Sequence, residues 1–313
     1  GTMGLVGYLS YRSGEKTVEA LAQKLLQENS KQVVQDTNYY LKFIRHLNHP
    51  YTPLLLSETG ELENLEQIHR YFIQQQKNFP VITSMIFARP NGEIVMTHHP
   101  SPTETEAGQS SPDNPQTITV HGVREDGTLG KPLRTLHNVN VRDDLWYRQA
   151  VATGKSGWSQ PSPTSIHRNR LSLNAYTPFY EPAGTLQGVF AASLSLEQLN
   201  QFLAERAVGE QGEVFIMQRD GLLIANSTGD PLSDIPNPPL LRSEPKTSLQ
   251  QNSGLEMANP LIYQSTQQLK TEFGSLDKIQ SLQSLSIAID GKPHYLQAVP
   301  FQNPYGFDWL VVS

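Results

Sequence analysis

The sequence predicts an α+β protein in which a long N-terminal helix is followed by two tandem antiparallel-sheet modules. Three observations support this fold class: an uninterrupted amphipathic segment near the N-terminus, a strand–turn–strand unit that occurs twice, and a further pair of strands after each copy. A chain of 313 residues is long enough to bury two separate cores.

Composition and charge exclude several classes of function. The net charge is -6 and the Lys and Arg residues are spread thinly, so no basic stripe is present that could neutralise a nucleic-acid backbone. The absence of Cys rules out disulfides and zinc-thiolate sites. No apolar run reaches the ~18 residues that would cross a bilayer.

The first element is a long amphipathic helix over residues 15–47, which contain neither Pro nor Gly and place apolar side chains three and four residues apart. The segment 49–53 ends it, because its two prolines lack amide hydrogens. A second helix is predicted over residues 61–78. The apolar face of the first helix packs either along its own sheet or against a second copy in a homodimer, and both alternatives stay open.

The repeated unit is a tight hairpin. It is predicted at residues 84–97, where Asn91-Gly92 supplies the positive-φ positions of the turn, and again at residues 213–226 around Asp220-Gly221. Each copy is followed by two more strands, at 171–180 and 186–193 in the first and at 294–301 and 308–312 in the second. Four elements in the same order predict two related modules.

The expected domain boundaries follow from this repeat. Residues 1–58 form the N-terminal helix, 59–207 the first module with a linker helix from residue 195, and 208–313 the second module. Residues 100–117 are rich in Pro, Ser, Thr and Gly and are predicted to be a mobile loop. Residues 230–259 are predicted to hold only short helical turns.

The segments that resemble catalytic or metal-binding motifs lack residues or spacings that those motifs need. A Walker-type loop needs a glycine five residues before Gly154, and Gln149 stands there, so Gly154-Lys155-Ser156 is predicted to be a turn after a helix over 145–152. His98 and His99 are neighbours in a strand, point to opposite faces and are expected at the surface. Asp143 and Asp144 suit a helix cap. We therefore expect no catalytic residue, metal site or cofactor.

The remaining signal is a concentration of aromatic and polar residues in the first module. Large aromatics with a polar atom favour cavity walls that are half wet. The strand 170–176 alternates, so Asn174 and Tyr176 share one face. The alternative is that the tryptophans are ordinary core aromatics. The candidate residues chosen from this pattern are Trp146, Tyr147, Trp158, Asn174 and Tyr176.

In this order the motifs resemble the double Cache (dCache) sensor domains, which consist of a long helix and two PAS-like modules. The matching segments are Trp146-Tyr147 with Ala150, Gly154, Trp158, 176–180, 184–189 and 195–199. The resemblance implies a small-molecule ligand in the first, membrane-distal module. In the amino-acid-binding members, it implies an Arg that holds the ligand's carboxylate and an Asp that holds its ammonium.

Here the two charged anchor positions carry Asp144 and Ser193. Both anchors are therefore missing, and amino-acid specificity is not carried over from the family. An acid at position 144 would repel a carboxylate, which favours a neutral, cationic or hydroxyl-rich ligand, or no ligand. Asp144 and Ser193 complete the predicted ligand site.

The resemblance also implies a place for the domain. The start of the chain reads like the outer end of a membrane helix and its end like a strand before another, although the leading Gly-Thr-Met could instead be vector-derived. We therefore expect an extracytoplasmic, periplasmic sensor joined to the membrane by flanking helices in a bacterial histidine kinase, chemoreceptor or cyclase. The alternative is a soluble or surface-anchored binding or adhesion protein without signalling output.

Overall fold

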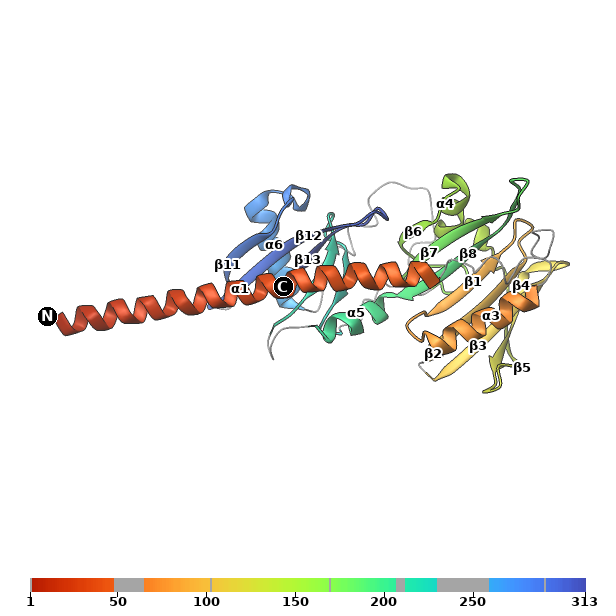
Figure 1. Cartoon of the computed structure of the whole chain (residues 1–313), viewed down its shortest axis with the longest axis horizontal. Helices are drawn as coiled ribbons and strands as arrows, with labels where there is room; N and C mark the ends of the chain where they lie inside the picture. Colours follow the sequence, from red (N-terminus) through yellow and green to blue (C-terminus); the bar gives the residue numbers. More distant parts are fainter. Residues whose placement is uncertain are drawn as a thin grey trace. The chain divides into compact units, whose positions relative to one another are not determined.

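The computed structural model describes residues 2–47, 65–101, 103–168, 170–206, 212–229, 259–289 and 291–313. It confirms the predicted α+β fold class, with a long helix and two antiparallel sheets (Figure 1). The chain divides into two units. The eight-stranded unit is formed mainly by Tyr39–Gln198, and the five-stranded unit by Gly1–Asn38, Leu199–Leu232 and Leu241–Ser313.

The first helix, α1, runs from Thr2 to Leu47 and contains the helix predicted over residues 15–47. Its apolar positions fall into two groups. Val33 is fully buried. By contrast, Val18, Leu21 and Leu25 are 67%, 58% and 52% exposed, and their spacing of three and four residues places them on one helical face. The N-terminal half of the helix therefore carries an exposed apolar stripe.

The eight-stranded unit contains one fully antiparallel sheet with the strand order β5-β4-β3-β2-β1-β8-β7-β6 (Figure 1). The two hairpin strands predicted at residues 84–97 are β1 and β2. The strands are β1 (Ser84–Ala88), β2 (Ile94–Ser101), β3 (Glu104–Ser111), β4 (Asn114–Val123), β5 (Leu129–Leu136), β6 (Gly157–Ser162), β7 (Ser172–Tyr180) and β8 (Leu186–Ser195).

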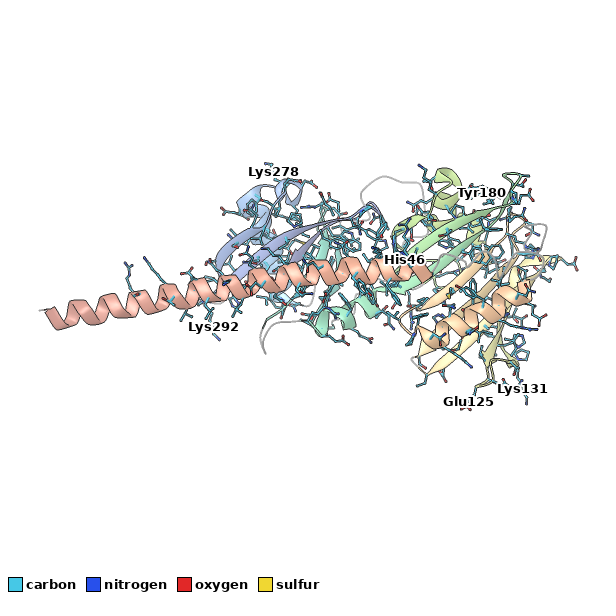
Figure 2. All side chains as sticks on the ribbon, in the orientation of Figure 1. His46, Glu125, Lys131, Tyr180, Lys278 and Lys292 are labelled. Carbon is cyan, nitrogen blue, oxygen red and sulfur yellow. The ribbon has the colours of Figure 1, made fainter. Side chains whose placement is uncertain are left out.

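The prediction of a mobile loop over residues 100–117 was wrong. This stretch supplies the end of β2, all of β3 and the start of β4. Composition misled the prediction because β3 buries no large apolar side chain: its buried residues are Glu106, Ala107, Gly108 and Ser110. Gly108 lies so close to its neighbour that an added Cβ would be 2.8 Å from Ile118 Cγ2. The edge strand β5 carries charge, as Figure 2 shows at Lys131, which discourages pairing with another chain.

Helices cover both faces of this sheet. On one face lies α3 (Leu65–Asn78), whose Phe72 packs edge-to-face on Phe190 with ring centroids 6.2 Å apart. On the other face lies α4 (Leu145–Thr153), which follows a 3-10 turn at Val141–Asp143. Gly154 ends α4 in the left-handed conformation with φ 63, which confirms the predicted turn at this position.

Gly188 marks the closest approach in the centre of the sheet. A Cβ at this position would lie 2.3 Å from Phe87 Cζ and 2.8 Å from the Ala88 carbonyl oxygen. We expect Gly188→Ala to lower the free energy of unfolding by about 1–3 kcal/mol, because the strand and the phenyl ring must separate. Gly14→Ala is the control, since nothing lies within 4 Å of its added Cβ. Urea denaturation showing equal stability for both variants would contradict this account.

The five-stranded unit has the strand order β10-β9-β13-β12-β11, again fully antiparallel. Its strands are β9 (Phe215–Gln218), β10 (Leu223–Asn226), β11 (Gln283–Ile289), β12 (Lys292–Gln302) and β13 (Asp308–Val312). The predicted second hairpin corresponds to β9 and β10. The predicted linker helix is α5 (Leu196–Ala204), whereas α6 (Pro260–Phe273) and β11 were not predicted. Most of the stretch 230–259 lies outside the described residues.

A polar cluster ties α1 to the last strand of this unit. Ser30 Oγ lies 2.6 Å from Ser313 Oγ, and Gln297 Nε2 donates to the Gln23 carbonyl oxygen of α1 at 3.0 Å. The backbone of Gln297 exchanges two hydrogen bonds with Ser313. The middle of the long helix and the end of the chain are thus held together by buried polar contacts.

Candidate functional site

The face of the eight-stranded sheet that carries α4 contains a continuous row of buried polar side chains. Directly opposite residues of antiparallel strands project from the same face, so the strand register defines the row. It crosses six neighbouring strands and comprises Ser159, Asn174, Ser193, Ser84, His98 and Glu106. We call these six residues the polar row. Two of them, Asn174 and Ser193, were predicted as site residues.

Hydrogen bonds link one half of the polar row. Asn174 Oδ1 accepts from Ser193 Oγ at 2.6 Å, and Asn174 Nδ2 donates to Ser159 Oγ at 3.4 Å. The next residue, Ser84, has a buried Oγ without a hydrogen-bond partner among the described residues. A buried hydroxyl without a partner loses hydration free energy, which makes this position a candidate contact for a ligand or a water molecule.

The other half of the row is charged. Glu106 accepts two bonds from the guanidinium of Arg134, at 2.6 and 2.5 Å, so its carboxylate is neutralised by a bidentate pair. His98 is only 5% exposed, and its Nδ1 atom lies 3.1 Å from the Thr83 carbonyl oxygen. The expectation that His98 lies at the surface was therefore wrong, because β2 is internal to the sheet rather than the start of a loop.

His98 stacks against a second imidazole, His167, with ring centroids 4.1 Å apart. Burial lowers the pKa of His98 to about 4 and that of His167 to about 3, and the nearby charges of Arg170 and Arg134 lower both pKa values further. The carboxylate of Glu106 opposes this change at His98. Both rings are therefore neutral at pH 7 and are held against each other without charge repulsion.

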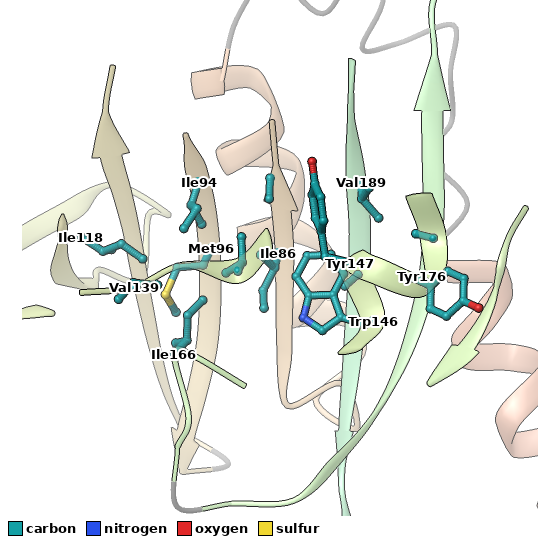
Figure 3. Packing of buried hydrophobic residues seen from close by; sticks show 14 of the residues in the cluster. Ile86, Ile94, Met96, Ile118, Val139, Trp146, Tyr147, Ile166, Tyr176 and Val189 are labelled. Atoms are coloured by element: carbon teal, nitrogen blue, oxygen red, sulfur yellow. The ribbon is translucent and has the colours of Figure 1, made fainter. Parts of the chain in front are cut away.

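Next to the polar row lies an apolar one, which α4 covers. Trp146, Tyr147 and Tyr176 join a core cluster with aliphatic residues of β1, β2 and β4 (Figure 3). Trp146 is fully buried and packs edge-to-face on Tyr147, with centroids 5.6 Å apart. The structure therefore brings these three predicted residues together in a buried cluster beside the polar row.

Asp144 connects α4 to the loop that carries His167. Its carboxylate accepts from the Ser165 amide at 2.9 Å, from Ser165 Oγ at 3.1 Å and from Trp146 Nε1 at 3.2 Å. Burial raises the pKa of Asp144 to about 7, although these three bonds oppose the rise. Three protein donors thus occupy the carboxylate, and Asp144 positions the loop and Trp146.

Trp158 is separated from the other predicted residues. It lies opposite Ala175 in the register of β6 and β7, whereas Asn174 and Tyr176 alternate with Ala175. Its side chain therefore emerges on the face of the sheet opposite the polar row. Of the seven predicted site residues, the structure brings six to one face of the sheet and leaves Trp158 on the other.

A cavity of about 410 Å³ opens beside the polar row, between the segment 135–139 on one side and residues 165–168 and 170 on the other. Val139 and Ile166 belong both to its wall and to the core cluster (Figure 3). His167, also in the wall, stacks on His98. A second cavity of about 530 Å³ lies at the C-terminal end of α3, against β2 to β5, and has acidic as well as basic side chains in its wall. None of the seven predicted residues lines either cavity.

Sequence reasoning missed five residues of this site: Ser84, His98, Glu106, Ser159 and His167. Their faces depend on strand pairing, which a single sequence does not reveal. One signal was present for His98, because it follows Ile94 and Met96 at strand spacing and both of these are buried apolar residues. The loop residue His167 carried no such signal.

Comparison with known proteins decides the family. A family model of the Cache domain, dCache_1, matches residues 10–313, nearly the entire chain. The chain belongs to the dCache family. The resemblance seen in the sequence is confirmed, and this dCache domain is accordingly an extracytoplasmic sensor module of the kind found in membrane receptors and is not an enzyme. None of the described helices combines the length and apolarity of a membrane span.

Solved structures share the fold of this dCache domain. A structure named methyl-accepting chemotaxis protein X is 14% identical with a TM-score of 0.56, covering 94% of this chain and 97% of its own. The ligand-binding domain of the Pseudomonas aeruginosa PAO1 chemoreceptor PctC, in complex with GABA, is 15% identical with a TM-score of 0.52 and coverages of 92% and 97%. The ligand-binding domain of the chemoreceptor PctB from the same organism, in complex with L-Gln, is 14% identical with a TM-score of 0.50. The match covers 91% of this chain and 87% of the PctB chain. A search of curated protein sequences returns no match.

Proposed function

We propose that this dCache domain is the periplasmic sensor of a bacterial transmembrane receptor and binds a small molecule in its membrane-distal module, residues 59–207. Residues 208–313 form the membrane-proximal module in this proposal. One observation carries it: a sheet face covered by α4 contains six buried polar side chains in a row, including the Ser84 hydroxyl, which has no partner in the part of the chain that the structure describes. A core built only for stability favours apolar residues at such positions.

The ligand contacts in this proposal come from the polar row and from the apolar cluster beside it on the same sheet face. Asn174 and Ser193 supply hydrogen-bonding groups, and Trp146, Tyr147 and Tyr176 enclose the apolar part of the ligand. Asp144 holds the loop in place. PctB and PctC are described with L-Gln and GABA, each of which carries an amino group and a carboxylate. Because the charged anchors expected for such ligands are replaced by Asp144 and Ser193, ordinary α-amino acids are not the ligands we propose.

Calorimetric titration of the purified domain against a metabolite library tests this function. We expect a compound outside the ordinary α-amino acids to bind, and Asn174→Ala to weaken binding, because Asn174 is hydrogen-bonded to both of its neighbours in the polar row, Ser159 and Ser193. Asn78→Ala, at the exposed last residue of α3 on the other face of the sheet, is the control. Tight binding of ordinary α-amino acids that survives Asp144→Ala would contradict the proposed specificity, and a library without any binder would contradict the sensor function.

The relay to the membrane follows from the elements at the two ends of the chain. A ligand shifts a receptor only if it prefers one arrangement of the domain over another. The contacts of Ser30 and Gln297 couple α1 to β13, so a displacement of either element is transmitted to the other. In the full receptor, disulfide cross-linking between the two membrane helices should change on ligand addition. Identical cross-linking with and without ligand would contradict the relay.

The proposal includes a homodimer formed through α1. The exposed stripe of Val18, Leu21 and Leu25 has the spacing of a coiled-coil seam and supports such pairing. The output domain in this proposal is a histidine kinase of a two-component system, with a chemoreceptor or a cyclase as alternatives. The soluble or surface-anchored binding protein remains the rival, which the absence of membrane segments in the full gene product would favour.

A further inference from the structure

The cavity beside the polar row differs from the rest of the protein in its charge. The chain as a whole has 30 acidic and 24 basic residues, yet among the described residues no Asp or Glu lines this cavity. Its ionisable lining residues are Arg168, Arg170, His137 and His167. A concave site with one sign of charge concentrates ligands of the opposite sign.

The two guanidinium groups are available to a ligand. Neither Arg168 nor Arg170 forms an ion pair with any carboxylate of the described residues. Arg168 is held in place across the cavity, since its Nη2 donates to the Asn138 carbonyl oxygen at 2.8 Å. Arg170 is exposed. Arginine presents several donors in a planar fork that fits oxyanions, so one fixed and one free guanidinium suit such a group.

The loop that carries both arginines is ordered by its own hydrogen bonds. The amides of Thr164 and Arg170 both donate to the His167 carbonyl oxygen, at 3.4 Å each, and the His167 amide donates to Thr164 Oγ1 at 3.0 Å. On its inner side, Ser165 is bonded to Asp144. A binding loop fixed before the ligand arrives loses less conformational entropy on binding.

A polar atom without a partner lies in the wall of the same cavity. His167 Nε2 is buried and has no hydrogen-bond partner among the described residues. The ring stacks on His98, which itself lies opposite Ser84, whose buried Oγ also has no hydrogen-bond partner among the described residues. These two atoms on either side of His98 leave hydrogen-bonding capacity that a polar group of a ligand can satisfy.

We propose that the cavity lined by residues 135–137, 139, 165–168 and 170 binds an oxyanionic group of a small metabolite, a carboxylate or a phosphate, through Arg168, Arg170 and His167. This inference rests on the proposed sensor function and names the chemical class of its ligand. It also revises the expectation from the sequence that Asp144 excludes anions. Asp144 faces Ser165 and Trp146, so it orients the loop from behind.

Protonation should strengthen oxyanion binding. The charged groups around the stacked imidazoles are Glu106, which is paired with Arg134, and Arg170, which forms no ion pair among the described residues. Burial is the main cause that keeps His98 and His167 neutral, and a bound anion counteracts it by favouring the protonated rings, so the complex takes up protons. Affinity should therefore rise as the pH falls from 7.5 to 5.5.

The test uses the purified domain with sodium acetate, sodium succinate, sodium citrate and inorganic phosphate, each titrated against sodium chloride at matched ionic strength. We expect saturable binding of at least one oxyanion, and a loss of affinity of about tenfold or more in Arg170→Gln. Arg148→Gln removes the same charge from the exposed face of α4 outside the cavity and should bind within twofold of wild type. Carboxylates and phosphate are separate arms, and binding in either arm supports the site.

Two results would overturn the inference. One is the absence of binding in every oxyanion arm, and the other is wild-type affinity in Arg170→Gln, whose exposed side chain can be removed without loss of a packing contact. A third outcome separates the two proposals. If no oxyanion binds but a neutral or cationic compound does, and Asn174→Ala weakens its binding, the sensor function is supported and the oxyanion site is contradicted. Circular dichroism of each variant shows whether a loss of affinity is a loss of fold.

Discussion

Acidification from pH 7 to pH 4 should destabilise the eight-stranded unit by several kcal/mol, and His167→Phe should remove a large part of this effect. The folded-state pKa of His167 is lowered by burial to about 3 and that of His98 to about 4, whereas an unfolded histidine titrates near pH 6.5. Between these values the unfolded chain binds protons that the folded chain excludes. The stability contribution is therefore complete above pH 6.5 and is lost as the pH falls toward 3.

Each unit of lowered pKa corresponds to about 1.4 kcal/mol, so each imidazole contributes about 3 kcal/mol or more at full effect. Phenylalanine at position 167 keeps an aromatic ring against His98 but cannot bind a proton. Urea denaturation at pH 4.5 and 7.0 measures the difference. His46→Phe replaces an exposed histidine of α1 and serves as the control. Equal pH dependence in wild type and His167→Phe would show that the ring is not buried as described.

Asp144→Asn should change the pH dependence of stability in the opposite direction. Burial raises the pKa of Asp144 to about 7, whereas an unfolded aspartate titrates near pH 3.9. Between these values the folded chain retains a proton that the unfolded chain releases, so stability falls as the pH rises from 4 to 7. The variant lacks the ionisable group, and relative to it wild type should lose about 4 kcal/mol across this window.

Asp143→Asn removes an exposed carboxylate from the adjacent position and is the matched control. In wild type, Asp144 and the two histidines change the stability in opposite directions as the pH changes. Their contributions are therefore measured as differences in the free energy of unfolding between variants. Denaturation curves at pH 4.5 and 8.0 give those differences. If Asp144→Asn and Asp143→Asn show the same pH dependence, the carboxylate of Asp144 is solvated and does not hold the loop.

Much of the architecture was predictable because it depends on local patterns. The long helix follows from residues 15–47, which lack Gly and Pro, and the hairpins follow from Asn91-Gly92 and Asp220-Gly221. The stretch 100–117 was not predictable in this way. Its strands bury small side chains and gain their stability from backbone pairing with neighbours far along the chain, so their composition resembles that of a loop.

The candidate site was predictable only within single strands. Alternation placed Asn174 and Tyr176 on one face, as the register confirms. Trp158 lies on the other face because it pairs with Ala175 and not with Asn174 or Tyr176, and this pairing is not visible in the sequence of β6 alone. The polar row and the stacked histidines arise from pairing between strands and from the fold of a loop, neither of which leaves a periodic signal in the sequence.

The central claim is that a small molecule binds in the unit formed by Tyr39–Gln198, on the sheet face covered by α4. The most direct measurement is the electron density of crystals grown with a compound that calorimetry identifies as a ligand. The account predicts density beside the polar row, in contact with the loop that Asp144 holds and with Arg168 or Arg170. Density located only in the five-stranded unit, at a saturating ligand concentration, would contradict it.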